Sequence, residues 1–166
     1  MAAIVPYEVS YTSVQVQVSC QGQTSDLFPV PLAASAPAIF SLDSTGKGQA
    51  AAINQDLSVN DAAHPAPIGS VISLYATGEG QTSPSGTDGV LAGPTLPQPV
   101  LPVSVAIGGI PVTPQYAGGV PGEVAGVMQV NVQIQPGVQP SNAVPVVLTV
   151  GAASSQPGVT IAVAGP

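Results

Sequence analysis

Alternation of apolar and polar positions is the clearest pattern in this chain. In residues 127–135, Val130, Val132 and Ile134 alternate with asparagine and glutamine, so one face of an extended segment is apolar and the other polar. This period of two predicts a half-buried β-strand, and the Pro-Gly pair at 136–137 predicts the turn that closes it. Similar runs predict two further strands, at residues 144–150 and 158–163.

The rest of the chain predicts more short strands and no helix. No segment keeps apolar residues at i, i+3, i+4 and i+7, while 19 glycines and 19 prolines favour many strands joined by turns. We therefore expect an all-β protein. The remaining strands are expected at residues 3–6, 14–20, 27–32, 38–42, 49–53, 68–77, 100–107 and 110–116. Gly108-Gly109 predicts a tight hairpin between the last two of them.

The first residues of the chain repeat the last ones. With an offset of about 130 positions, Val14, Val16 and Val18 align with Val144, Val146 and Leu148, and the pair Thr24-Ser25 aligns with Ser154-Ser155. After one residue of slippage, Val30 and Leu32 align with Val159 and Ile161. The repeat predicts three parts: the second half of one β module (1–37), a connecting hairpin and linker (38–66), and a complete module (67–166).

Two segments of the complete module are predicted to be loops, at residues 78–99 and 118–126. The first is rich in Gly, Ser, Thr and Pro, and a loop of that length in a compact domain is usually functional or mobile. Loops at one end of a rigid sandwich are where recognition residues gather. The carboxylates in these segments, Glu79, Asp88 and Glu123, are therefore candidate ligand-binding residues.

The charge balance excludes some partners. The chain has eight carboxylates, one lysine and no arginine, with a formal net charge of −7. Without cationic side chains there is no surface to neutralise phosphates, which disfavours nucleic acid and anionic membranes as partners. No stretch approaches the ~20 apolar residues of a membrane span. The N-terminus also lacks the pattern of a signal peptide. We expect Met1 to begin a fragment of a longer protein whose missing part carries an export signal.

His64 is the one histidine, and it suggests a catalytic alternative. Asp61 precedes it, Ser70 follows it, and Cys20 could supply a thiol, so the ingredients of nucleophilic catalysis are present. However, the Gly-x-Ser-x-Gly nucleophile elbow is missing, and a loop histidine beside proline is more often solvated. Cys20 cannot form a disulfide within the chain, and the favoured interpretation is a small core residue.

The chain has few side chains that could bind a metal ion. One histidine and one cysteine do not supply the three or four ligands that zinc prefers. Asp43 and Asp56 lie among further oxygen-bearing side chains and are weak calcium candidates, although neither segment has EF-hand spacing. Asp at such positions more often stabilises a turn. We therefore expect no cofactor, with calcium as the alternative.

Seven stretches of the chain together resemble a known family: IVPYEV (4–9), APAIF (36–40), GQAAAINQD (48–56), PIGSVISLYATGEG (67–80), VAIGGI (105–110), QVNVQI (129–134) and AVPVVLTVG (143–151). The family that they resemble is the uncharacterised C-terminal domain abundant in secreted proteins of Solibacter-type acidobacteria. Its repeats are similar to the immunoglobulin-like IPT/TIG sandwich, and the resemblance covers essentially all 166 residues. It implies an exported protein in an extracellular or cell-surface setting. The family has no established catalytic residues, so none is transferred.

These observations favour a non-catalytic β-sandwich with a structural, adhesive or ligand-binding role. Its expected partners are carbohydrate or another surface protein, and the alternative is a weak or promiscuous hydrolase with its site around His64. Half a sandwich exposes an apolar sheet face and unpaired edges, which are templates for association. Residues 1–37 are therefore predicted either to pack on the complete module or to form a homodimer.

Overall fold

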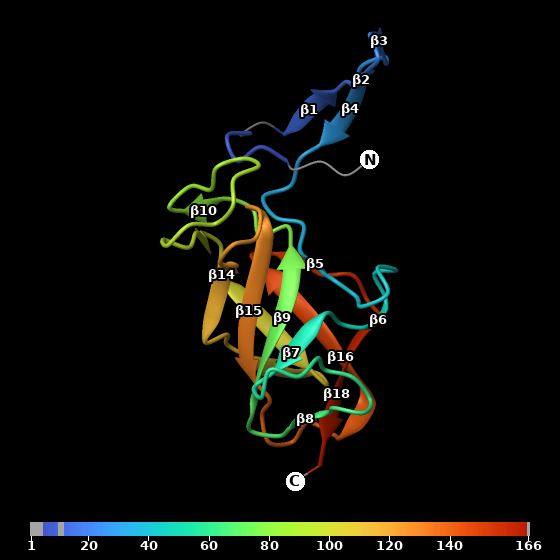
Figure 1. The fold of residues 1–166 in the computed structure, drawn as a ribbon, viewed down its shortest axis with the longest axis vertical. Coiled ribbons are helices and arrows are strands. Elements are labelled where there is room, and N and C mark those ends of the chain that lie inside the picture. Colours follow the sequence, from blue (N-terminus) through green and yellow to red (C-terminus); the bar gives the residue numbers. More distant parts are fainter. Residues whose placement is uncertain (1–4, 10–11, 166) are drawn as a thin grey trace.

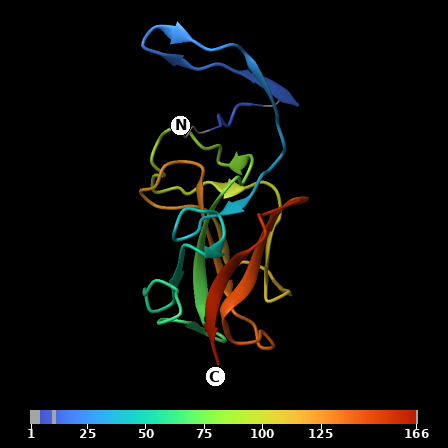
Figure 2. The ribbon, with the colours of Figure 1, turned by 90° about the vertical axis from the view of Figure 1, so that its right-hand side faces the viewer.

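The computed structural model describes residues 5–9 and 12–165, which form a sandwich of two β-sheets with a β-hairpin extending from one end (Figure 1). The described residues contain strands, bridges and turns but no helix. The all-β prediction is therefore confirmed. The hairpin stands clear of the sandwich in both ribbon views (Figures 1 and 2).

The first sheet is built around two long central strands, β9 (Val71–Thr77) and β15 (Val127–Gln133), which pair antiparallel over their whole lengths. On one side β15 pairs with β14 (Tyr116–Gly119). On the other side β9 pairs with two short strands, β5 (Ala38–Ile39) and β7 (Ala52–Asn54). The order across this sheet is therefore β14-β15-β9-β5, with β7 also on β9.

The second sheet has the order β13-β12-β16-β18-β6. Its antiparallel strands are β13 (Ile110–Val112), β12 (Val103–Ile107), β16 (Ser141–Val150) and β18 (Val159–Ala164). A short β17 (Ala153–Ser154) adds to β16. Two short strands, β6 (Gly48–Gln49) and β8 (Ala66–Pro67), run parallel to β18.

The core lies between these two sheets and follows the period of two read from the sequence. In β9 and β15 every second residue is buried, with partly exposed residues between them. The same alternation in β16 buries Val144, Val146, Leu148 and Val150. Alternate side chains point to one face of a strand, so each sheet contributes one apolar face to a shared core. Central buried side chains include Ile72, Leu74, Met128, Val130, Val132, Val146, Leu148 and Ile161.

The predicted strand 110–116 is divided between the two sheets. Gly108 and Gly109 both have positive φ and join β12 to β13 with Ile107 opposite Ile110, the two-residue hairpin that the sequence predicts. Pro114 follows the end of β13 and cannot donate a backbone hydrogen bond to a sheet partner. The chain then crosses to the other sheet, where Tyr116 begins β14.

Residues 38–66 belong to the sandwich rather than to a linker. They contribute β5 and β7 to the first sheet and β6 and β8 to the second. Each piece is only two or three residues long, because turns at 43–47 and 55–58 interrupt the segment. These pieces cover one edge of each sheet, which limits association through those edges.

The N-terminal hairpin pairs β1 (Ser13–Val16) with β4 (Phe28–Pro31), and β2 (Ser19–Cys20) with β3 (Gln23–Thr24). It does not pack on the sandwich: Val16 is 42% exposed and Phe28 69% exposed. Cys20 is also exposed, so its interpretation as a core residue is wrong. The reason is that nothing in the described chain lies over this hairpin. The predicted strand 3–6 begins outside the described residues, and Val5 and Pro6 are not in a strand.

Residues 34–37 anchor the hairpin to the sandwich. The Ser35 hydroxyl is buried and donates to the carbonyl oxygen of Val150 at 2.7 Å, and the Ala36 N–H donates to the carbonyl oxygen of Gly78 at 2.9 Å. The backbones approach so closely here that a Cβ on Gly78 would lie 1.8 Å from the oxygen of Ala36. Gly78 also has a φ of 81°, so glycine is required on both counts.

Candidate functional site

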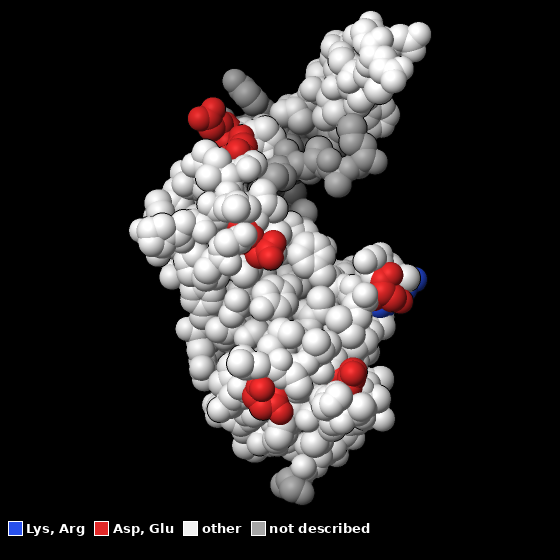
Figure 3. Space-filling model, in the orientation of Figure 1, with Lys and Arg blue, Asp and Glu red and all other residues white. Residues whose placement is uncertain are grey.

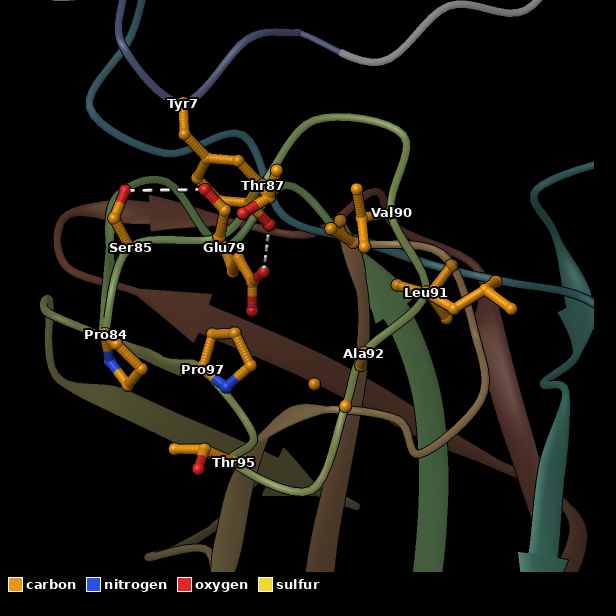
Figure 4. Close-up of a pocket in the computed structure, with 16 residues that line it drawn as sticks. Tyr7, Glu79, Pro84, Ser85, Thr87, Val90, Leu91, Ala92, Thr95 and Pro97 are labelled. Carbon is orange, nitrogen blue, oxygen red and sulfur yellow. Dashed lines mark hydrogen bonds between the residues drawn. The ribbon is translucent and has the colours of Figure 1, made fainter.

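The end of the sandwich next to the hairpin contains a cavity of about 260 Å³. Its wall is formed mainly by residues 84–97 and by the segment before β15, and Tyr7 and Glu79 close one side of it (Figure 4). The lining is mostly apolar or glycine with a few hydroxyl groups. The described lining residues are Tyr7, Glu79, Pro84, Ser85, Gly86, Thr87, Val90, Leu91, Ala92, Gly93, Thr95, Pro97, Gly119, Ala125, Gly126 and Val127.

The long segment that forms this wall is held by backbone pairing. The two predicted loops, 78–99 and 118–126, form hydrogen bonds with each other. The Ala92 N–H donates to the Glu123 carbonyl at 2.8 Å, and the Ala125 N–H donates to the Val90 carbonyl at 2.9 Å. Within residues 78–99, β10 (Thr82–Ser83) pairs with β11 (Gln98–Pro99). The cavity wall is therefore built from hydrogen-bonded backbone.

Glu79 is the one buried carboxylate among the described residues, with 3% of its surface exposed. It lies two residues after the end of β9, so the central strand of the first sheet fixes its position. The Tyr7 hydroxyl donates to Oε1 at 3.0 Å. The second oxygen, Oε2, is buried without a hydrogen-bond partner. In Figure 4 that oxygen points to the side of the cavity where Pro84 and Pro97 lie.

Tyr7 reaches this site from the N-terminal segment and is itself 8% exposed. Three contacts with residues 79–88 fix it: its hydroxyl binds Glu79, its N–H donates to Oδ1 of Asp88 at 2.9 Å, and its carbonyl accepts from the Gln81 side-chain amide. Its ring lies against Gly86, where a Cβ would come within 2.5 Å of a ring carbon. Tyr7 therefore connects the N-terminal part of the chain to the sandwich.

Burial and uncompensated negative charge set the acid–base properties of the site. Burial raises the pKa of Glu79, and the hydrogen bond from Tyr7 opposes this rise only in part. Burial, followed by the charge of Glu79, raises the pKa of Tyr7 well above its ordinary value. The same two causes raise the pKa of Tyr116 on β14. The described lining residues include no lysine, arginine or histidine to offset this charge.

The three sequence-predicted binding carboxylates have different surroundings. Glu79 lines the cavity, whereas Asp88 is exposed and accepts the Tyr7 N–H outside it. Glu123 is exposed and supports the wall through its backbone carbonyl. Sequence reasoning missed Tyr7. The repeat offered a signal, because an offset of 130 aligns Tyr7 with Gly137, so an aromatic residue stands where the second copy has glycine.

The residues proposed for catalysis are not assembled into one site. Asp61 Oδ1 accepts from the backbone N–H of His64 at 2.7 Å and lies 3.1 Å from its Nδ1, in an exposed turn where the His64 side chain is 60% exposed. The Ser70 hydroxyl instead donates to the Pro67 carbonyl at 2.6 Å. Cys20 is in β2, while β8 follows His64 by two residues, and these two strands lie at opposite ends of the molecule (Figure 1).

The calcium candidates stabilise turns. Oδ1 of Asp43 accepts hydrogen bonds from the hydroxyl of Ser41 and from the N–H and hydroxyl of Thr45, and these bonds lower the pKa of Asp43, the Thr45 N–H most. Asp56 accepts likewise from Ser58, which lowers its pKa. Within the described residues no three His, Cys, Asp or Glu side chains are grouped to hold a metal ion.

The outer surface adds no concentrated charge on the face that Figure 3 shows. Carboxylates appear there as separate groups, and the chain's one lysine lies at the edge of the view. Nowhere in residues 5–9 and 12–165 is there a helix of the length and apolar character needed to cross a membrane.

Comparison with protein families, with curated proteins and with solved structures found no match to this chain.

Proposed function

We propose that this chain is a non-catalytic, immunoglobulin-like β-sandwich that binds a ligand in the cavity beside Glu79. The observation that carries the proposal is the Oε2 atom of Glu79, which is buried at the cavity wall without a partner. A buried polar atom left without a hydrogen bond costs about 1–3 kcal/mol. A ligand that donates to this oxygen would offset that cost.

The strand order supports the immunoglobulin-like assignment. The order β5-β9-β15-β14 corresponds to strands A, B, E and D of that fold, and β18-β16-β12-β13 corresponds to G, F, C and an added C′ strand. The short β6 and β8 lie parallel to β18, as a first strand that changes sheets would. The finer IPT/TIG assignment rests on the sequence resemblance.

The chemistry of the cavity supports binding rather than catalysis. General acid–base catalysis needs a proton donor and acceptor placed on the reacting atoms, and nucleophilic catalysis needs a base beside the nucleophile. Among the described lining residues the one carboxylate is Glu79, and its oxygen Oε1 is already engaged by Tyr7. The proposed extracellular setting, with carbohydrate or a surface protein as partner, rests on the resemblance alone.

A fragment-binding experiment tests this function. The ¹⁵N-labelled chain would be titrated with small alcohols, amines, amides and monosaccharides, and the backbone amides of Gly86, Gly119 and Gly126 would report binding in the cavity. We expect at least one hydrogen-bond donor to shift these amides and Glu79→Gln to weaken its binding. Asp61→Asn is the matched control, since it alters an exposed carboxylate. If no fragment shifts the three amides, the proposal is wrong.

The hydrolase alternative is tested on the same protein. An esterase and phosphoesterase substrate panel would be assayed across the fractions of a size-exclusion column. We expect no activity to follow the protein peak. Activity that follows the peak and disappears in His64→Ala would instead assign the exposed Asp61–His64 turn as an active site.

We also propose that the N-terminal hairpin forms a homodimer through its apolar face. Val14, Val16, Phe28 and Val30 lie opposite one another in the β1–β4 ladder and share that face. Asp26 is the only charged residue between 12 and 32, so two such faces can meet without like-charge repulsion although the whole chain carries −7. An uncovered apolar face of this kind favours a self-complementary contact.

Light scattering after size-exclusion chromatography tests the dimer. We expect a dimer that Phe28→Ser converts to a monomer. Leu57→Ser is the matched control, because Leu57 is also exposed, at 82%, but lies in a turn of the sandwich. A monomeric parent protein over the micromolar range would exclude this interface.

A further inference from the structure

Several backbone donors around the cavity are used within the protein. Pro84 and Pro97 have no N–H, and the Gly86 N–H donates to the hydroxyl of Thr82 at 3.0 Å. Further lining N–H groups donate to carbonyl oxygens of the surrounding loops. These groups belong to Val90, Ala92, Gly119, Ala125 and Val127. A ligand that presents hydrogen-bond acceptors can still meet the hydroxyl groups of Ser85, Thr87 and Thr95, but a negatively charged ligand meets no positive side chain among the described lining residues.

The buried polar atom that the cavity leaves without a partner is an acceptor. Oε2 of Glu79 is buried and unpartnered, and Oε1 is held by the Tyr7 hydroxyl at 3.0 Å, so the carboxylate group is fixed with one oxygen free. No positive side chain is present among the described lining residues, and the chain has one lysine against eight carboxylates. Negative charge inside a partly apolar site is stabilised most by a charge-assisted hydrogen bond from a cation.

We infer that the cavity binds a protonated primary amine on a short apolar chain, with the ammonium group donating to Oε2 of Glu79. This inference rests on the proposed function and names its ligand class. Val90, Leu91 and Pro97 supply apolar surface for the methylene groups. The ammonium lies against Glu79, and the chain extends along the wall formed by residues 84–97.

The size of the cavity agrees with such a ligand. Its volume is about 260 Å³, below the roughly 300–1,000 Å³ that is usual for drug-sized molecules. A short alkylammonium group needs less, whether it belongs to a free small amine or to a lysine side chain of a partner protein. Both sources share the same chemistry, an ammonium at the end of a methylene chain.

An inorganic cation fits the site less well. Calcium takes six to eight oxygen ligands and magnesium demands octahedral geometry. The lining provides one carboxylate, and no metal-holding group of His, Cys, Asp or Glu side chains occurs among the described residues. An ammonium group needs fewer acceptors and gains from apolar contact along its chain, which a bare metal ion cannot.

The inference is tested with matched probes of one shape. The full chain would be titrated with n-butylammonium chloride, 1-butanol and sodium butyrate at constant ionic strength, with the amides of Gly86, Gly119 and Gly126 as reporters. We expect butylammonium to bind about tenfold more tightly than butanol, the effect of one charge-assisted hydrogen bond, and butyrate to bind most weakly. A second titration with Nα-acetyl-lysine methylamide distinguishes the sources, because stronger binding than butylammonium indicates a lysine of a partner.

A variant tests whether Glu79 is responsible for the preference for butylammonium. Glu79→Gln should remove most of the preference for butylammonium over butanol, while Asp61→Asn should leave it unchanged. If Glu79→Gln does not fold, the three probes on the parent protein still decide the question. Equal binding of butanol and butylammonium, or tighter binding of butyrate, would overturn the ammonium inference and leave the proposed binding function standing. Failure of all probes together with the neutral fragments would overturn both.

Discussion

Two hairpins in this chain share a sequence pattern but differ in environment. The hairpin of β1 and β4 at the N-terminus and the hairpin of β16 and β18 in the sandwich are related by an offset of about 130 residues. In both, alternate valines line one face. In β16 that face is buried under the opposite sheet, with Val146 1% exposed, whereas the equivalent Val16 is 42% exposed. The comparison shows which features of a hairpin form from the local sequence alone and which depend on burial under a second sheet.

The closed end of each hairpin, its corner, is built from equivalent hydrogen bonds. The N–H of Leu148 donates to the hydroxyl of Ser155 at 3.0 Å, and the N–H of Val18 donates to the hydroxyl of Ser25 at 3.1 Å. A pair of hydroxyl groups 3.1 Å apart lies beside this bond in each copy, on Thr149 and Ser154 and on Ser19 and Thr24. The corner geometry is therefore local to the sequence and needs no second sheet.

The first prediction concerns burial and has the largest expected effect. Val146→Ala removes methyl groups from the core and should lower the free energy of unfolding by about 2 kcal/mol. In protein dilute enough to be monomeric, the matched change Val16→Ala should cost less than about 0.5 kcal/mol, because that side chain is partly exposed already. Urea denaturation of both variants measures the difference. Equal losses would mean that the N-terminal hairpin is covered in solution, as the proposed dimer requires at high protein concentration.

The second prediction concerns the corner serines. Ser155 is 8% exposed, so Ser155→Ala leaves the buried N–H of Leu148 without its side-chain acceptor and should cost about 1.5 kcal/mol. Ser25→Ala removes an equivalent bond where water can replace the hydroxyl, and its cost should be near zero. Thermal unfolding followed by circular dichroism compares them. A large effect of Ser25→Ala would contradict the exposed position of that corner.

The third prediction concerns Glu79, where the N-terminal segment meets the sandwich. Burial raises its pKa in the folded protein above the ordinary 4.5, so folding favours the protonated form. The stability from this group is complete below pH 4.5 and is lost as pH rises through the folded pKa. The loss grows with the difference between the folded and unfolded pKa values of this carboxyl group, because that difference sets how much more tightly the folded protein holds the proton.

Denaturation of the parent protein and of Glu79→Gln between pH 4.5 and 7 measures this loss. The parent should become less stable across the window, and the variant should change less. Asp43, Asp56 and Asp61 do not interfere, because their pKa values are lowered and their contributions are lost only as pH falls below about 3.8. A parent protein whose stability is independent of pH in this window would argue against a buried Glu79.

The fourth prediction has the smallest effect on stability. Cys20 is exposed and aligns with Val150, which is fully buried. The thiol of Cys20 should react with a thiol reagent in the native protein, and Cys20→Ser should leave the unfolding midpoint unchanged. In that background Val150→Cys should react only on unfolding. Protection of Cys20 in the native protein would show that another surface covers the hairpin tip.

The sequence determined the long strands and the repeat, because both depend on interactions between near neighbours. The period of two in residues 127–135, the Gly108-Gly109 hairpin and the aligned hairpins all follow from side-chain alternation and turn chemistry. It also indicated the loop carboxylates as candidates, of which Glu79 lines the cavity. The short strands within 38–66 were missed as parts of the sandwich, since two-residue strands leave no period to detect.

Tertiary structure decided burial and the site. The alternating valines are core residues in β16, whereas in β1 Val14 is half-buried and Val16 exposed, because burial depends on a second sheet that the local pattern does not specify. Tyr7 and Glu79 are 72 positions apart, and their hydrogen bond arises where the chain folds back over the end of the sandwich. A buried carboxylate with one unpaired oxygen is a property of that packing, so only the folded chain distinguishes Glu79 from the exposed Asp88 and Glu123.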